Sequence, residues 1–181
     1  MQTVDLSSNF FALFDLPVSF DVDLDALSVR YREAQRAVHP DKFANASEVE
    51  RRLSVQMAAR INEAYQILKD PLLRGRYLLE LQGVAPDDAD TSFDGAFLME
   101  QMELRERLAE VKNSANPVQQ LHVIASDIAV HDKLLITQMA SLLSETSTKS
   151  LQQARDVSRK LQFFRRLNEE VETLEDELGD Y

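Results

Sequence analysis

The sequence predicts an all-α protein in two parts, an N-terminal helical hairpin and a C-terminal three-helix bundle. The chain of 181 residues contains only 4 glycines and 5 prolines, so turns are few and the elements between them are long. Leu, Ala, Glu, Gln and Arg are abundant, and these residues favour helices. Apolar residues recur at spacings of three and four, as expected for one face of a helix.

The first helix of the hairpin is predicted from Asp21 to Val38, after a short apolar stretch at residues 9–16. Its apolar stripe consists of Leu24, Leu27, Tyr31, Ala34 and Val38. Pro40 ends this helix, because the residue before a proline is forced out of helical geometry.

The second helix of the hairpin is expected to begin at Ser47, which forms a capping box with Glu50. It ends at Asp70-Pro71, and a short helix follows at residues 72–81. The apolar stripe of the second helix consists of Leu53, Met57, Ile61, Ala64 and Leu68. Two helices with matching stripes and a short loop between them form an antiparallel hairpin.

A linker is predicted at residues 83–95, GVAPDDADTSFDG, because the segment holds two glycines, a proline and four aspartates. We therefore expect one domain at residues 1–82 and a second at residues 96–181. Three helices are predicted in the second domain, at about 97–112, 116–143 and 151–178.

Composition excludes several functions. The net charge of −11 argues against nucleic acid as the main partner, because phosphate binding needs a basic surface. The charge is uneven, with a net of −2 in residues 1–80 and −9 in residues 81–181, which indicates different partners for the two parts. The absence of cysteine excludes disulfides, thiolate metal sites and a cysteine nucleophile. No cofactor is expected.

A cytoplasmic location is expected, with no membrane contact. The first positively charged side chain is Arg30, so the N-terminus lacks the basic region of a secretory signal. No apolar run is long enough to span a bilayer.

The tip of the predicted hairpin carries the tripeptide HPD and three nearby cations. These residues are His39, Pro40, Asp41, Lys42, Arg32 and Arg36. The two arginines lie one turn apart and away from the apolar stripe, so an exposed, basic tip is expected. The proline restricts the backbone, which lowers the entropic cost of holding its neighbours for binding.

Taken alone, the tripeptide has two other interpretations. One is a solvated turn in which Asp41 caps local backbone amides. The other is an enzyme in which Asp41 orients His39 as a general base. Against the enzyme, the spacing around a proline does not obviously aim the carboxylate at the ring. No nucleophile, oxyanion hole or cleft is apparent either.

Residues 1–80 resemble the J domain of DnaJ-type co-chaperones. The shared features are the opening stretch NFFALFDLP, a basic-faced helix, HPD, and a long helix with INEAYQIL followed by DP. The resemblance implies docking onto a DnaK-type ATPase chaperone. By position, the HPD tripeptide would trigger ATP hydrolysis in that partner, and the three cations would supply the electrostatic contact.

The segment DGAFLMEQMELRERLAEV predicts a helix with two apolar faces. One face consists of Phe97, Leu104, Leu108 and Val111. The opposite side carries Leu98, Met99 and Met102. A surface helix normally has one apolar stripe, so the second either packs against another helix of the bundle or is an exposed binding patch. Methionine suits gap filling, whereas methionines flanked by glutamates favour a partner surface.

The last predicted helix contains two adjacent aromatic residues, Phe163 and Phe164, which point about 100° apart. Phe164 lies closer to the apolar stripe of this helix, and Phe163 nearer its edge.

The other two histidines, His122 and His131, are nine residues apart and are not expected to bind a metal together. His131 falls on an apolar stripe and is interpreted as a core or edge histidine with satisfied polar atoms.

The string AFLMEQMELRE, placed after a J-like region and before a bundle with KLxF, resembles the HscB-type co-chaperones of bacterial iron–sulfur cluster assembly. The likeness spans nearly the whole chain. It implies that the J domain recruits the chaperone HscA, while the bundle binds the cluster scaffold IscU and delivers it. By position, the scaffold-binding residues are Leu98, Met99, Met102, Glu103, Glu106 and Phe163. Met102 stands where the family commonly has leucine, a volume-conserving change.

Within this resemblance the chain fits the bacterial form, because eukaryotic members add a cysteine-paired metal site and this chain has no cysteine. It follows that the protein cannot hold a cluster by thiolates and must act on another protein that does. Besides the acid–base enzyme at His39 and Asp41, two rival functions remain. One is a general J protein for unfolded clients, although the chain lacks the usual Gly/Phe-rich or zinc-binding regions. The other is a structural adaptor with an incidental HPD.

Overall fold

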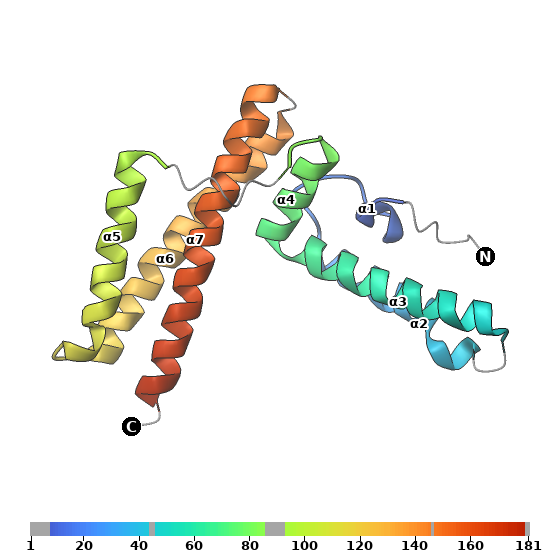
Figure 1. Ribbon diagram of the computed structural model, residues 1–181, viewed down its shortest axis with the longest axis horizontal. Coiled ribbons are helices and arrows are strands. Elements are labelled where there is room, and N and C mark those ends of the chain that lie inside the picture. The colour runs from blue at the N-terminus through green and yellow to red at the C-terminus, as the bar shows by residue number, and fades with distance from the viewer. Residues whose placement is uncertain (1–7, 44–45, 86–92, 146, 180–181) are drawn as a thin grey trace. The chain divides into compact units, whose positions relative to one another are not determined.

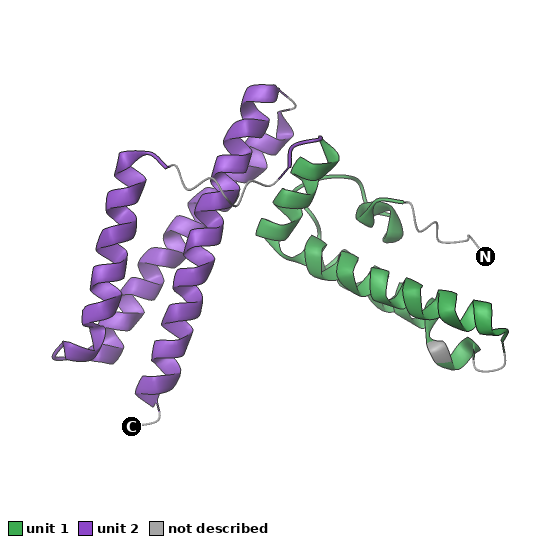
Figure 2. Ribbon diagram, viewed as in Figure 1, with its two compact units in different colours: residues 1–82 green, residues 83–181 purple. Residues whose placement is uncertain are grey.

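The structure is a computed structural model that describes residues 8–43, 46–85, 93–145 and 147–179. Every regular element in these residues is a helix, which confirms the predicted all-α class (Figure 1). The chain divides into two compact units, unit 1 at residues 1–82 and unit 2 at residues 83–181 (Figure 2). Residues 86–92 of the predicted linker lie outside the described residues.

Unit 1 is built on an antiparallel hairpin of α2 (Leu24–Val38) and α3 (Glu48–Lys69). The short helix α1 (Phe10–Leu13) and the helix α4 (Pro71–Leu81) also pack against α3 (Figure 1). A 3₁₀ turn, η1 (Pro40–Phe43), lies at the tip of the hairpin. The largest fully buried side chains of unit 1 are Phe11, Phe14, Leu27, Ile61, Leu68 and Leu79.

Side-chain caps define where the helices of unit 1 begin. The Ser47 hydroxyl accepts the Glu50 N–H while the Glu50 carboxylate accepts the Ser47 N–H, so the predicted capping box is confirmed. Hydrogen bonds from Ser47 hold the pKa of Glu50 below its ordinary value. Asp70 ends α3 and also caps α4, where its side chain accepts the Leu73 N–H at 2.9 Å.

Two leucines of the predicted hairpin stripes are not buried, and the prediction is wrong for them. Leu24 is 52% exposed and Leu53 is 47% exposed. Leu24 is the first residue of α2 and Leu53 lies in the second turn of α3, so both are near a helix end. Periodicity places a residue on a face of a helix, but it does not say how far along that face a neighbour reaches.

Unit 2 consists of α5 (Gly95–Glu110), α6 (Pro117–Ser144) and α7 (Thr148–Gly179), with a 3₁₀ turn, η2 (Val111–Asn113), after α5. The predicted bounds of these three helices agree with the structure to within one turn. α6 and α7 form the most extensive helix pair, and α5 packs beside them (Figure 1).

The core of unit 2 lies where its three helices meet. It contains Phe97, Leu104, Leu108, Val111, Leu121, Ile124, Ile128, Phe163, Phe164, Leu167 and Val171. The ring of Phe97 lies edge-on to Phe163 and Phe164, at centroid distances of 5.7 and 6.0 Å. Phe163 is 7% exposed and Phe164 is 1% exposed, so both rings are buried and Phe163 is the one nearer the edge, as predicted. The stripe of α7 faces both α5 and α6 and is therefore wide enough to bury both adjacent rings.

Replacing a core leucine of unit 2 with alanine should lower the free energy of unfolding far more than replacing a surface leucine of the same unit. Leu167 is fully buried and Leu134 is 63% exposed. We expect Leu167→Ala to lower the free energy of unfolding by about 2–5 kcal/mol, because it leaves a cavity among the phenyl rings. Leu134→Ala should change it by no more than about 0.5 kcal/mol. Urea unfolding followed by circular dichroism measures both, and equal losses would contradict this description of the core.

Candidate functional site

The tip of the α2–α3 hairpin presents His39 and Asp41 to solvent. α2 ends at Val38, and the His39 carbonyl accepts the Lys42 N–H at 3.0 Å within the 3₁₀ turn. The side chains of His39 and Asp41 are 54% and 88% exposed. The side chain of Pro40 lies outside the described part of the structure. A reactant held at this tip would remain in water, which disfavours an active site.

His39 and Asp41 lie close together at the tip. The Asp41 carboxylate is 3.4 Å from His39 Nδ1, a proximity that the spacing around the proline did not indicate. The Asp41 N–H, however, donates to the same Nδ1 at 3.3 Å. A neutral ring that accepts this hydrogen bond carries its proton on Nε2, and the outward nitrogen is then a donor rather than a base. With this amide hydrogen bond formed, Nδ1 does not donate to the Asp41 carboxylate, which an Asp-oriented general base requires.

Three exposed cations accompany the tip. Arg32, Arg36 and Lys42 are exposed, and none forms an ion pair with another described residue. Arg30, on the same helix, is already paired with Asp15 at 2.9 Å. Cations without a partner on an exposed surface attract and orient an acidic partner surface. The three cations and the His39–Asp41 pair form the first candidate site, here called the HPD tip.

The outer face of α5 carries a patch of exposed apolar side chains, here called the α5 patch. It consists of Leu98, Met99 and Met102, which are 42%, 73% and 63% exposed. The opposite face of α5 is buried in the core of unit 2. Of the two alternatives that the sequence leaves open, the structure has the exposed patch. Glu103 and Glu106 are also exposed and form an acidic rim beside it.

Contacts at its start fix α5 on α7. The Asp94 carboxylate caps the helix by accepting the Phe97 N–H at 2.9 Å and pairs with Lys160 Nζ of α7 at 2.8 Å. The Lys160 ammonium also lies 4.7 Å from the centroid of the Phe97 ring. Hydrogen bonds from Lys160 and from the Phe97 amide hold the pKa of Asp94 below its ordinary value.

Two polar contacts fix the side of α5 that faces α6. Glu100 lies 2.8 Å from His131 Nδ1, and Arg107 lies 2.8 Å from Asp127. The ring of His131 also packs against Phe164, at a centroid distance of 5.2 Å. The interpretation of His131 as an edge histidine with satisfied polar atoms is confirmed. With Asp94 on one side and these pairs on the other, the α5 patch is held outward.

Phe163 lies beneath the surface rather than in the α5 patch. The guanidinium of Arg105 covers it, with Cζ 5.3 Å from the ring centroid. The structure therefore brings five of the six predicted scaffold-binding residues to one surface and leaves the sixth under Arg105. Arg105 was not among the predicted site residues. Its spacing of seven from Leu98 and three from Met102 could have found it, since these positions share one side of a helix.

Neither a metal-binding cluster nor a membrane-crossing helix is found in the described residues. They contain no group of three His, Asp or Glu side chains placed to hold a metal ion. Among their helices, none combines the length and the apolarity that a membrane crossing requires.

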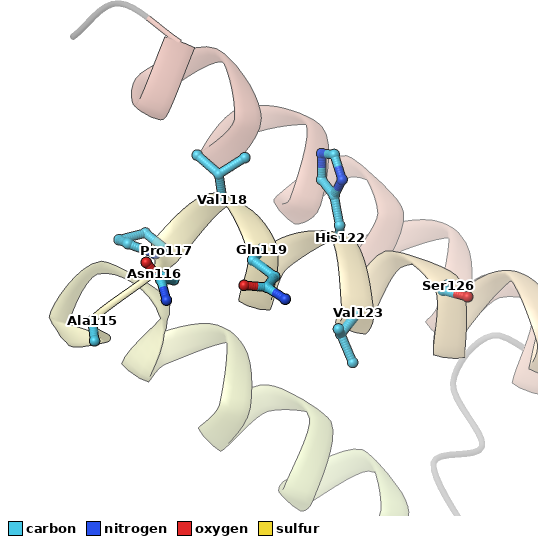
Figure 3. A pocket seen from close by; sticks show the side chains of 8 residues that line it. All are labelled: Ala115, Asn116, Pro117, Val118, Gln119, His122, Val123 and Ser126. Atoms are coloured by element: carbon cyan, nitrogen blue, oxygen red, sulfur yellow. The ribbon is translucent and has the colours of Figure 1, made fainter.

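A shallow hollow at the start of α6 is a weaker candidate (Figure 3). It is lined by Ala115, Asn116, Pro117, Val118, Gln119, His122, Val123 and Ser126. In the figure the side chains of Val118 and His122 point to one side of α6, while Val123 points to the other. Its side chains do not converge on one point, as ligand binding requires, so we do not assign it a function.

The ion pair of Asp94 should make the stability of unit 2 depend on pH. Its folded-state pKa lies below the ordinary 3.8, so the stability it contributes is complete above that value and is lost as the pH falls through the lower pKa. Asp94→Asn keeps a capping side chain but removes this contribution. We expect the variant to be less stable than the wild type at neutral pH, and the difference to shrink at about pH 3.

Urea unfolding of both proteins at the two pH values measures this effect. Asp176→Asn is the control for the change in net charge, because Asp176 is exposed and forms no ion pair with the described residues. A stability difference between wild type and Asp94→Asn that is the same at both pH values would show that the ion pair contributes nothing.

Comparisons with known proteins agree with this description. The family model described as "HSCB C-terminal oligomerisation domain" matches residues 93–172. The co-chaperone protein HscB homolog of Colwellia psychrerythraea is 46% identical over 173 residues, which cover 95% of this chain and 99% of the relative. The homolog of Shewanella denitrificans is 43% identical with the same coverage.

Solved structures show the same similarity. Chaperone HscB from Vibrio cholerae matches with a TM-score of 0.84 at 43% identity, over 94% of this chain and 99% of that one. The human co-chaperone protein HscB also matches with a TM-score of 0.84, at 32% identity, over 96% of this chain and 85% of that one. HscB proteins are co-chaperones rather than enzymes, with a J domain followed by a C-terminal helical domain. This chain belongs to the HscB co-chaperone family.

Proposed function

We propose that this protein binds an IscU-type iron–sulfur scaffold through the α5 patch and delivers it to an HscA-like, DnaK-type chaperone. The HPD tip docks on that chaperone and stimulates its ATP hydrolysis, in support of iron–sulfur cluster assembly and transfer. Chaperone docking is assigned to residues 1–82, scaffold binding to residues 96–181 and the connection to residues 83–95. The expected compartment is the cytoplasm.

One observation carries this proposal: a single chain exposes two chemically different surfaces. The HPD tip is polar and basic, with cations that form no ion pair among the described residues. The α5 patch is apolar and has an acidic rim. Surfaces that differ in this way suit two different partners, as an adaptor between a client and a chaperone requires.

The α5 patch has the character of a binding hot spot. Each Leu or Met side chain contributes about 1.5–3 kcal/mol when it is fully buried from water, so three adjacent ones can form the centre of an interface. The acidic rim of Glu103 and Glu106 favours a scaffold surface that places cations around an apolar centre. Phe163 is assigned a supporting role, because Arg105 must move before a partner can touch its ring.

The HPD tip acts on chemistry in the partner. Neither His39 nor Asp41 is enclosed, and the ring nitrogen that faces Asp41 already accepts a backbone hydrogen bond. The two side chains instead offer a donor and a carboxylate acceptor in a fixed arrangement. We infer that they rearrange the nucleotide site of the chaperone, where the phosphoryl transfer takes place.

Loss of the HPD tip should remove ATPase stimulation and nothing else. We expect His39→Gln to abolish the stimulation of a purified HscA-like chaperone, because the exposed imidazole is lost while the helices that carry it are unaffected. Scaffold binding and helicity should match the wild type. ATP turnover by the chaperone is measured with each protein, with Asn113→Gln, on the other unit, as the matched control. If His39→Gln retained full stimulation, the protein would be a structural adaptor with an incidental HPD.

Loss of the α5 patch should weaken scaffold binding and leave ATPase stimulation intact. The variant Leu98→Ala/Met99→Ala/Met102→Ala should bind the scaffold at least about 30-fold more weakly, equivalent to about 2 kcal/mol, because it removes the apolar anchors. Isothermal titration calorimetry with a purified IscU-type scaffold measures the affinity. Direct stimulation of the chaperone in the absence of scaffold should remain.

The matched control replaces three other exposed apolar side chains of unit 2, Val123, Val130 and Leu134, with alanine. These lie on α6, so their loss should leave scaffold affinity unchanged. Equal affinity of the wild type and the α5 variant would remove the patch from the interface. Absence of binding by the wild type would favour a general J protein with another client.

A further inference from the structure

We propose that Met99 and Met102 form a reversible oxidation site, through which a peroxide turns off docking at the α5 patch. This inference concerns the regulation of the patch and rests on its proposed role in scaffold binding.

The methionines differ sharply in exposure. The chain contains 5 methionines. Met1 lies outside the described residues, and Met57 and Met139 are buried, with 7% and 0% of their surface exposed. Met99 and Met102 are 73% and 63% exposed. A thioether must be reached by the oxidant to react, so the described methionines that an oxidant can reach are the two in the α5 patch.

No thiol in this chain competes for the oxidant. Thiolates react with peroxides in most proteins, and the chain contains 0 cysteines. Two-electron oxidation of its sulfur atoms is therefore confined to thioethers, and among the described methionines the burial of Met57 and Met139 directs it to α5.

The chemistry is a balanced oxygen transfer. The methionine sulfur attacks one oxygen of the peroxide, so that an S–O bond forms and the O–O bond breaks. The sulfur is oxidised by two electrons, and with hydrogen peroxide the second oxygen leaves as water. A dithiol reductase reverses the step, because the sulfoxide oxygen leaves as water while the dithiol becomes a disulfide.

The new oxygen has no partner on the acidic side of the patch. A sulfoxide is a strong hydrogen-bond acceptor, and the neighbouring rim residues Glu103 and Glu106 are acceptors only when ionised. Arg105, three residues after Met102, can donate, but its guanidinium lies over Phe163 and a turn toward Met102 would uncover that ring. An apolar partner surface would thus bury an unsatisfied polar atom, which opposes docking.

Oxidation at these two positions leaves the fold intact. Both side chains lie on the face of α5 opposite to Phe97, Leu104 and Leu108, which hold the helix on the core. A sulfoxide at Met57 or Met139 would instead place a polar group among buried side chains. The site therefore controls binding without unfolding the protein.

The test begins with the purified full chain exposed to hydrogen peroxide, which catalase then removes before any scaffold is added. Peptide mass mapping should find one added oxygen on Met99 and one on Met102, with Met57 and Met139 unmodified and helicity unchanged. Calorimetric titration with a purified IscU-type scaffold should then show affinity weakened about tenfold or more. Treatment with methionine sulfoxide reductase should restore it.

Met99→Leu/Met102→Leu is the matched variant. Its affinity before peroxide is its own reference, and the affinity after peroxide should equal that reference because no reactive sulfur remains in the patch. The inference is overturned if the oxygen maps to Met57 or Met139 in the folded protein. It is also overturned if oxidised wild type binds as tightly as unoxidised, or if the leucine variant loses affinity as the wild type does.

The two proposals fail in different ways in this experiment. If unoxidised wild type binds the scaffold and oxidised wild type binds equally well, the scaffold-binding role stands and the oxidation switch is overturned. If unoxidised wild type does not bind, the scaffold-binding role itself is overturned, and the switch with it.

Discussion

The surface of unit 2 depends on the attachment of one helix, α5, to the α6–α7 pair. α5 carries two apolar faces, and a three-helix core can bury only one of them. The rings of Phe97, Phe163 and Phe164 hold one face inward, while Asp94–Lys160, Glu100–His131 and Arg107–Asp127 set the rotation of the helix. The other face must then point outward, so the α5 patch is a consequence of core packing and not of a surface loop. Because a helix is rigid, the three side chains keep their spacing and suit a defined partner surface.

Unit 1 exposes a polar surface instead of an apolar one. Pro40 ends α2, and the caps at Ser47 and Asp70 define the ends of α3, so the hairpin projects its polar tip away from its own core. The tip holds a histidine, a carboxylate and three cations without enclosing them. Such a surface can bind a partner and act on it. It cannot exclude water from a reaction held at the tip itself. Under the proposed function, the division of the chain into an apolar and a basic surface lets one protein join a client to an ATPase.

Much of the fold could be predicted from the sequence, because the signals that determine the helices are local. Helix type and bounds follow from apolar spacing, and the capping box of Ser47 and Glu50 is readable as two residues three apart. The most specific part of the resemblance to HscB proteins is one string in α5, and relatives along nearly the whole chain confirm the resemblance. The burial predicted for Leu24 and Leu53 was wrong, and the cover of Phe163 by Arg105 was not predicted. Spacing identifies the faces of a helix, but which face is covered, and by what, is decided by packing between distant segments. The approach of Asp41 to His39 was missed for a related reason, since a short turn can fold a side chain back on its predecessor.

The central claim is that the outward face of α5 is the surface that meets the scaffold. Nuclear magnetic resonance of the isotope-labelled full chain, titrated with an unlabelled IscU-type scaffold, tests it directly. The account predicts that the largest changes in amide chemical shift fall at residues 98, 99, 102, 103 and 106, with smaller ones at Arg105 and Phe163 beneath it. The HPD tip and the hollow at the start of α6 should not respond. Changes concentrated at Val118 to Ser126, or at the hairpin tip, with α5 unaffected, would contradict the account.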